Sequence, residues 1–141
     1  MTTAGKAAFG TLLKIGANAI AEVTSITLPQ LTAGDVDMTN MSSANGYKEF
    51  IQGLKDGGEL SIEANYIVGD TNGQVALMTL FNSGAIQAFI VTFPGSTALA
   101  HWDFSGYVKS IGTTASLDGK IGFNCAIKLT GMPTLTAGAP A

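Results

Sequence analysis

The chain has 141 residues, of which 46% are hydrophobic and only 12% charged, and its formal net charge is −3. This length favours a single domain, residues 1–141, with one substantial core. All of its basic residues are lysines. Because arginine is the preferred residue for bidentate phosphate and base contacts, the composition argues against tight nucleic-acid binding. The low charge is typical of a surface that is partly covered in an oligomer.

The first half of the chain predicts one strand followed by a long connection. Residues 1–18 are rich in glycine, alanine and threonine and are expected to form an arm. A strand is expected over residues 21–28, because β-branched residues lead up to Pro29. The connection over residues 29–58 is far longer than a normal hairpin loop. It nevertheless carries large apolar side chains that require burial: Val36, Met38, Met41, Tyr47, Phe50, Ile51 and Leu54. This combination indicates a surface that another subunit covers.

A strand and a helix are expected next. Residues 59–66 alternate between two kinds of side chain, which is typical of a strand with one buried face. The apolar face would hold Leu60, Ile62, Ala64 and Tyr66, and the polar face Glu59, Ser61, Glu63 and Asn65. A helix is expected over residues 74–82, with Asp70 or Asn72 as its cap and Gly84 just beyond its end.

Three more strands are expected after the helix, over residues 87–93, 102–111 and 116–130. A turn is expected at residues 112–114, Met132-Pro133 is expected to end the last strand, and residues 134–141 are expected to form a tail of small residues. This order of elements predicts an α+β, mainly β fold. The expected architecture is an antiparallel β-sandwich or open barrel with one flanking helix and a long inter-strand loop.

Residues that usually carry catalysis or bind metals are sparse. His101 is the only histidine and Cys125 the only cysteine, and no zinc-ligand spacing surrounds them. Cys125 shares its parity with neighbouring apolar residues, which predicts a core position. Asp103 lies on the same strand face as His101 and favours a surface pair, although a Ser–His–Asp arrangement stays open because triads assemble in space. We expect no catalytic residue, no cofactor and no metal.

Two further features bear on possible ligands and membranes. Asp35 and Asp37 are expected to lie on a polar or intersubunit face, with weak cation binding as the alternative. The apolar stretches 74–81 and 85–93 are far shorter than the ~20 residues of a spanning helix. No membrane partner is therefore expected.

Several motifs, taken in order, resemble the major tail tube proteins of long-tailed bacteriophages. The strongest are Asp35-Val36-Asp37-Met38-Thr39 and Phe50-Ile51-Gln52-Gly53-Leu54-Lys55-Asp56-Gly57. Weaker motifs lie at residues 25–29, 63–66, 104–108 and 128–133. The resemblance covers about residues 15–133. Such proteins are similar in fold to the tubes of contractile tails and of type VI secretion.

The resemblance implies a structural virion protein without enzymatic activity, which assembles with itself into stacked hexameric rings. Residues 32–58 would be the assembly loop, with Asp35, Asp37, Met38, Met41, Tyr47, Phe50, Ile51 and Leu54 at the subunit interface. Glu22, Glu59, Ser61, Glu63 and Asn65 are the candidates for the lumen, through which phage DNA would pass without specific binding during genome ejection. The other implied partners are the tape measure, tail tip and tail terminator proteins. The implied location is the phage tail, assembled in the host cytoplasm, and both contractile and non-contractile tails stay open.

Two alternatives belong to other classes of protein. One is a capsid decoration protein, an adhesin or another β-sandwich binding module that forms no tube. The other is a small β-barrel enzyme or carrier with a pocket near His101, Asp103 and Tyr107. Neither alternative requires the connection over residues 32–58 to be long and apolar.

Overall fold

A computed structural model describes residues 10–16, 18–67, 69–94, 100–115, 117 and 119–136. Its strands in chain order are β1 (Leu12–Ile15), β2 (Asn18–Ala19), β3 (Val23–Thr27), β4 (Thr32–Asp37), β5 (Phe50–Asp56), β6 (Glu59–Asn65), β7 (Gln87–Thr92), β8 (His101–Thr114) and β9 (Gly122–Thr136). The helix α1 (Gln74–Ser83) lies between β6 and β7, and a short 3-10 turn, Ala44–Gly46, lies between β4 and β5.

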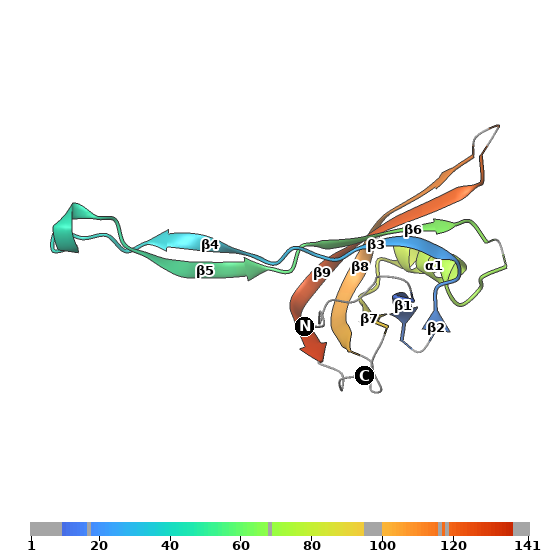
Figure 1. Ribbon diagram of the computed structural model, residues 1–141, viewed down its shortest axis with the longest axis horizontal. Helices are drawn as coiled ribbons and strands as arrows, with labels where there is room; N and C mark the ends of the chain where they lie inside the picture. Colours follow the sequence, from blue (N-terminus) through green and yellow to red (C-terminus); the bar gives the residue numbers. More distant parts are fainter. Residues whose placement is uncertain are drawn as a thin grey trace, which may run out of the picture.

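Seven strands form one curled sheet with the order β2-β1-β7-β8-β9-β6-β3, and every neighbouring pair is antiparallel. The curl brings α1 and the β1–β7 part of the sheet beneath β3 and β6 (Figure 1). Strands β4 and β5 form a separate two-stranded sheet that extends away from this body. The architecture confirms the predicted mainly β fold, an open barrel with one flanking helix.

The core lies inside the curl of the sheet. Its largest fully buried side chains are Phe89, Leu13, Leu60, Ile62, Leu77, Ile127 and Val91. The rings of Phe89 and Phe104 stack with their centroids 5.7 Å apart. Strand β6 confirms the predicted alternation for six residues, because Leu60, Ile62 and Ala64 are buried whereas Glu59, Ser61 and Glu63 are exposed. The prediction is wrong for Tyr66, which lies beyond the end of β6 and is exposed. Cys125 is a buried core residue, as predicted.

The described part of the predicted N-terminal arm belongs to the sheet. Leu12–Ile15 pair with β7, from Leu12 opposite Thr92 to Ile15 opposite Phe89, and Leu13 is completely buried. The arm prediction is therefore wrong for these residues, because alternating Leu13 and Ile15 outweigh the glycine-rich surroundings. Residues 1–9 and 17 of the predicted arm lie outside the described residues.

The last two strands both end later than predicted, and β9 begins at Gly122 rather than at residue 116, so that it is shifted along the chain and not longer. β8 continues through the expected turn to Thr114, which pairs with Gly122. β9 continues through Pro133 to Thr136, so the predicted start of the tail at residue 134 is wrong, and residues 137–141 lie outside the described residues. Proline is tolerated there because β6 pairs only with residues 122–128 of β9 and a bulge separates the pairs on either side of Gly131.

The helix begins and ends where its signals predicted. The Asp70 carboxylate accepts hydrogen bonds from the backbone N–H groups of Gln74, at 3.1 Å, and Ala21, at 3.0 Å. Asp70 rather than Asn72 therefore supplies the side-chain acceptor at this end. Gly84 ends the helix with φ +69°, a conformation that glycine adopts without a steric cost.

Candidate functional site

The predicted assembly loop is a long β-hairpin. β4 and β5 pair from Thr32 opposite Asp56 to Asp37 opposite Phe50, with a bulge between Ala33 and Asp35. The hairpin projects from the body as a separate arm (Figure 1). Most of the connection between β3 and β6 is therefore regular structure, and only the residues around Ala44–Gly46 form its tip.

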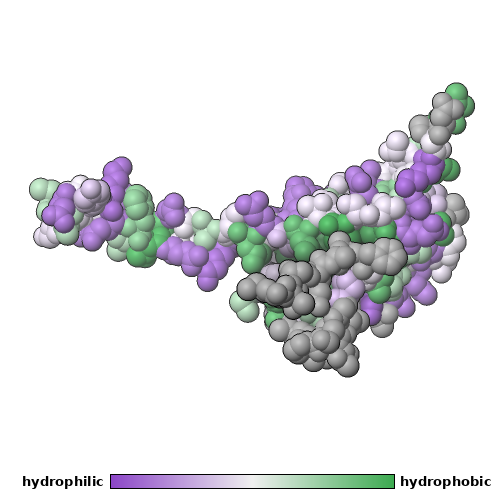
Figure 2. All heavy atoms as spheres, viewed as in Figure 1, coloured by the Kyte–Doolittle hydropathy of each residue, from purple (hydrophilic) through white to green (hydrophobic). Residues whose placement is uncertain are grey.

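The side chains of this hairpin are uncovered in a single copy of the chain. All eight residues predicted at the subunit interface lie on it and are exposed: Asp35, Asp37, Met38, Met41, Tyr47, Phe50, Ile51 and Leu54. Leu54 is 93% exposed and Tyr47 75% exposed. Figure 2 shows patches of hydrophobic side chains on this arm, between hydrophilic ones. An exposed group of apolar side chains of this kind marks an interaction surface.

Hydrogen bonds hold the tip of the hairpin in one conformation. Asp37 accepts from the Thr39 backbone N–H at 2.9 Å, and the Thr39 hydroxyl accepts from the Glu49 N–H at 2.8 Å. The Ser43 hydroxyl donates to the Glu49 carboxylate at 2.7 Å. The bonds from Thr39 lower the pKa of Asp37, since they stabilise its charged form.

A glycine in a left-handed conformation and an ion pair fix the base of the hairpin to the body. Gly58 has φ +76°, and a Cβ atom there would lie 2.6 Å from the Gln30 carbonyl oxygen. Asp56 accepts from the Gly58 N–H at 2.8 Å and from the Lys128 ammonium at 2.9 Å. These two bonds lower the pKa of Asp56. The Leu129 N–H donates to the Gly58 carbonyl at 3.1 Å.

A second surface covers the side of the sheet that faces away from the core. Cross-strand partners share a face, and the register places Thr27, Ser61 and Ala126 in one row and Ser25, Glu63 and Asn124 in the next. We call this surface the polar sheet face. It comprises Ser25, Thr27, Glu59, Ser61, Glu63, Tyr107, Lys109, Asn124, Ala126 and Lys128.

Most of the charges on the polar sheet face are paired. Lys109 of β8 makes an ion pair with Glu59 of β6, and its hydrogen bond to Glu59 raises the pKa of Lys109. Lys128 of β9 is paired with Asp56. Glu63 has no ion-pair partner among the described residues. Its backbone carbonyl accepts from the Thr24 hydroxyl at 3.1 Å.

The five predicted lumen residues do not all lie in the same setting. Glu59, Ser61 and Glu63 are exposed on the polar sheet face. Asn65 is half-buried, and its side-chain N–H donates to the Glu22 carboxylate at 3.2 Å. Glu22 lies before β3 in a left-handed conformation with φ +49°. The structure therefore brings Glu22 and Asn65 together at the end of β6, beyond Glu63.

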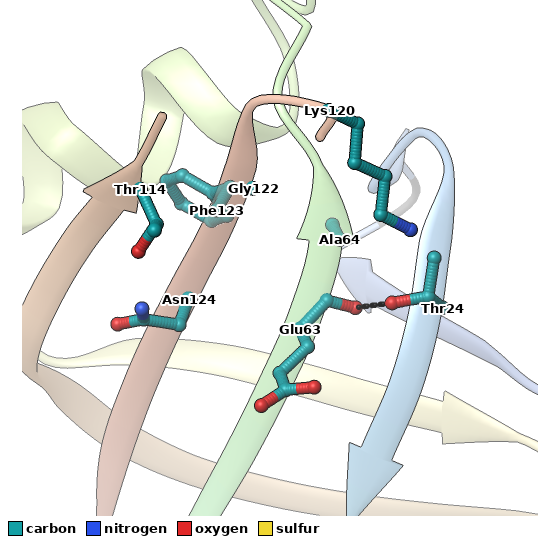
Figure 3. A pocket seen from close by; sticks show the side chains of 8 residues that line it. All are labelled: Thr24, Glu63, Ala64, Thr114, Lys120, Gly122, Phe123 and Asn124. Carbon is teal, nitrogen blue, oxygen red and sulfur yellow. Dashed lines mark hydrogen bonds between the residues drawn. The ribbon is translucent and has the colours of Figure 1, made fainter. Parts of the chain in front are cut away.

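A shallow depression of about 220 Å³ adjoins Glu63. Its lining residues come from β3, β6, the ends of β8 and β9, and the turn between them: Thr24, Glu63, Ala64, Thr114, Lys120, Gly122, Phe123 and Asn124. Figure 3 shows the Glu63 carboxylate and the Lys120 ammonium on different sides of it. His101, Asp103 and Tyr107, which the sequence suggested as an alternative pocket, do not line this depression.

The residues that most often carry catalysis or bind metals form one surface pair and one buried thiol. His101 Nε2 lies 3.2 Å from Asp103 Oδ2, so the predicted surface pair is confirmed. Burial raises the pKa of the Cys125 thiol to about 12. No group of three or more metal-ligating side chains occurs in the part of the chain that the structure describes. In that same part, none of the helical structure has the length and hydropathy needed to cross a membrane.

Sequence reasoning missed two features of these surfaces. It did not find the ion pairs of Lys109 and Lys128, because they join strands far apart in the chain. It also placed no residue of α1 at a functional surface, although Val75, Met78 and Phe81 are exposed. The signal for α1 was present, since the predicted helix contains no charged residue.

A one-sided polar sheet with a long, exposed apolar hairpin defines a structural subunit that assembles through its surface. The family model of the Lambda phage tail tube protein matches residues 2–136. The chain belongs to this family and is a structural protein of the tail tube. No curated protein matches the chain.

Solved structures share the fold at low sequence identity. The tail of the empty GTA particle has a TM-score of 0.77 at 20% identity, over 94% of this chain and 100% of that chain. The sheath/tube terminator of the PVC extracellular contractile injection system has a TM-score of 0.77 at 11% identity, over 97% and 100%. The SPP1 tail tube has a TM-score of 0.65 at 14% identity, over 93% and 77%.

Proposed function

We propose that six copies of the chain close into a ring and that the rings stack into the tube through which the genome is ejected. The observation that carries this proposal is the polar sheet face, a solvated surface on the outer side of four adjacent strands, β3, β6, β9 and β8. In a closed ring this face would line the lumen. The protein would form the wall of the tube and would not catalyse a reaction.

Two strand edges are available for closing the ring. β7 pairs only with residues 101–106 of β8, and residues 107–114 have a strand partner on the β9 side alone within the described residues. At the other end of the sheet, β3 pairs only with β6 in that same set. Open edges present unpaired N–H and C=O groups to another strand. The β3 edge of one copy and residues 107–114 of the next would continue the sheet around the ring.

The charges of the polar sheet face suit a conduit for DNA. Glu59 and Asp56 form ion pairs with the ammonium groups of Lys109 and Lys128. These cations are therefore less available to phosphates. Glu63 would repeat six times in each proposed ring and repel the phosphate backbone. Glu22, Ser61 and the half-buried Asn65 would add polar groups without a basic side chain.

The hairpin would supply the contacts between subunits. Its exposed residues Asp35, Asp37, Met38, Met41, Tyr47, Phe50, Ile51 and Leu54 form the proposed interface. Contacts between different surfaces of identical subunits are head-to-tail: around the axis they would close into the ring, and from ring to ring they would add copies without limit. Tail tip, tape measure and tail terminator proteins would therefore start the tube, set its length and stop it, and assembly would take place in the host cytoplasm.

Electron microscopy of the purified protein, over a range of concentrations, tests the assembly. We expect rings or hollow tubes of uniform bore, with six-fold symmetry in averaged cross-sections. Tubes of another symmetry would overturn the ring number. Discrete particles at every concentration, also after addition of tail tips, would overturn self-assembly and favour a binding module.

A charge reversal in the polar sheet face tests the lumen. Glu63→Lys removes a negative charge from every copy and adds a positive one, so assembled tubes should retain DNA or slow its ejection at low salt. Glu63→Gln is the matched control and should change ejection much less. Equal ejection by Glu63→Lys and the unmodified chain would place the lumen on another face.

A further inference from the structure

The outer side of α1 is apolar and uncovered. Val75 is 41% exposed, Met78 43% and Phe81 44%. They follow one another at intervals of three residues and so form one row along the helix. Leu77 is buried in the core, and Ala76 and Leu80 pack against it. Helix α1 contains no charged residue, and Ile86 extends the exposed apolar surface beyond its end.

One face of the hairpin is mainly apolar, and the other carries two aspartates together with Phe50. Val36 pairs with Ile51 across the two strands, so both side chains lie on one face. Met38 joins them two positions further, where its N–H donates to the Glu49 carbonyl at 2.8 Å. We call Met38, Val36 and Ile51 the apolar hairpin face. The neighbouring pairs, Asp37 with Phe50 and Asp35 with Gln52, point to the opposite face.

These two apolar surfaces cannot meet within one copy. The hairpin extends away from the body, whereas α1 lies beneath β3 and β6 at the other end of the molecule (Figure 1). Both surfaces therefore stay exposed until another molecule covers them. Since the chain belongs to a family of tube proteins, a second copy is a partner that is always present.

We infer that the apolar hairpin face of one copy docks on the outer row of α1 in a second copy. This inference rests on the proposed self-assembly. Helix α1 carries no charge, and the hairpin face carries one only at its tip end, where Glu49 lies opposite Met38 and its carboxylate accepts from the Ser43 hydroxyl. Docking of Val36 and Ile51 therefore removes apolar area from water without the desolvation of an ion. The hairpin's orientation is set by its other face, because a half-turn would press Asp35 and Asp37 against a helix that offers no cation. The cost of burying these unpaired carboxylates excludes the orientation that is rotated by half a turn.

Cross-linking between single-cysteine variants tests this contact. The natural Cys125 does not interfere, because it is buried and the pKa of its thiol is raised to about 12. One preparation carries Ile51→Cys, and a second, affinity-tagged preparation carries Met78→Cys. Each is mixed as a minority into the unmodified chain, so that tubes form even if a variant assembles poorly alone. A short bismaleimide is then added to the tubes.

We expect a covalent dimer of one tagged and one untagged chain, formed in tubes and absent from monomers. Gln52→Cys is the matched control, because it lies next to Ile51 in sequence but on the face that carries the two aspartates, and its use should lose the dimer. Leu117→Cys, at the exposed turn between β8 and β9, is the control for the acceptor. Tubes in which Ile51→Cys links no better than Gln52→Cys, or links to Leu117→Cys instead, would overturn the inference. Such a result would leave the proposed tube function intact, whereas absence of tubes would overturn both.

Discussion

Strands β5 and β6 follow each other in the chain and each contain seven residues, but they lie in opposite environments. In β6, Leu60, Ile62 and Ala64 alternate with exposed residues, and β3 and β9 flank the strand. In β5, every residue except Gly53 is exposed, and β4 is its only neighbour among the strands that the structure describes. The difference shows that the buried residues of β6 stabilise a single copy, whereas the exposed residues of β5 are available for contacts between two copies.

The physical reason is the number of strands in each sheet and the presence or absence of a buried face. A two-stranded hairpin is marginally stable in water by itself, whereas a strand in a larger sheet with a buried face is not. The hydrogen bonds at the tip and the ion pair at the base hold the hairpin in place, but they leave its apolar side chains in solvent. Contact with a second copy would therefore stabilise the hairpin while leaving the body almost unchanged.

The largest effect is expected from a charge on the apolar hairpin face. Ile51→Asp should abolish tubes, because assembly would bury an unpaired carboxylate. The monomer should keep its stability to within about 0.5 kcal/mol, since Ile51 is already exposed. Electron microscopy and urea unfolding measure the two quantities. Gln52→Asp places the same charge on the face that already carries Asp35 and Asp37 and should impair assembly less, and equal loss in both variants would contradict the distinction between the faces.

The reverse behaviour is expected in the body. Phe89→Ala removes a fully buried ring and should lower the free energy of unfolding of the monomer by about 3–5 kcal/mol. Leu54→Ala in the hairpin, at a side chain that is 93% exposed, should change it by less than about 0.5 kcal/mol. Urea denaturation of monomeric protein compares them. A similar loss in both variants would mean that the hairpin packs on its own body.

Regular patterns carried most of the fold prediction. The alternation over β6 and the glycine after α1 are local signals, and both elements formed where they were expected. The hairpin was expected as a loop because Asp35, Asp37 and Gly53 are poor strand formers, and it is pairing between β4 and β5 that outweighs them. β1 was missed because its four residues follow a stretch without any strand signal.

The candidate surfaces were only partly predictable. Exposed apolar residues in the connection were found because their number was unusual for a loop. The pairing of Glu59 with Lys109 was not found, because it joins β6 to β8 across β9, and alternation within a strand does not reveal this order of strands. The outer row of α1 was missed because helical spacing of apolar residues normally indicates a core-facing side.

The orientation of the hairpin at its base can be tested with two glycines. Gly58 and Gly131 both have positive φ, but only Gly58 has a close neighbour where a side chain would begin. Gly131→Ala should cost about 1–2 kcal/mol for the left-handed backbone alone. Gly58→Ala should cost more, because it adds the clash with the Gln30 carbonyl. Urea unfolding gives both values, and tube assembly should be impaired most by Gly58→Ala; equal costs would show that Gln30 yields freely.

The smallest effect is expected from protonation of the two hairpin aspartates. The pKa values of Asp37 and Asp56 are both lowered from the ordinary 3.8. Each therefore contributes stability that is present above that pH and is lost as the pH falls through the lowered pKa. Asp37→Asn and Asp56→Asn should each remove part of this acid dependence, although an asparagine oxygen can still accept the backbone N–H bond. Thermal unfolding between pH 5 and pH 2 measures the dependence.

The position of each aspartate decides where that loss appears. Asp56 ties the hairpin to Lys128 of the body, so its variant should lower the melting temperature of the whole monomer at about pH 5, and the difference from the unmodified chain should disappear toward about pH 2. Asp37 accepts from the Thr39 N–H within the hairpin tip, so its variant should speed hydrogen exchange of the Thr39 amide and leave the melting temperature nearly unchanged. Equal changes in melting temperature would show that hairpin and body unfold as one unit. The contrast between β5 and β6 would then be a difference in solvent exposure and not in stability, because the hairpin would unfold only together with the body.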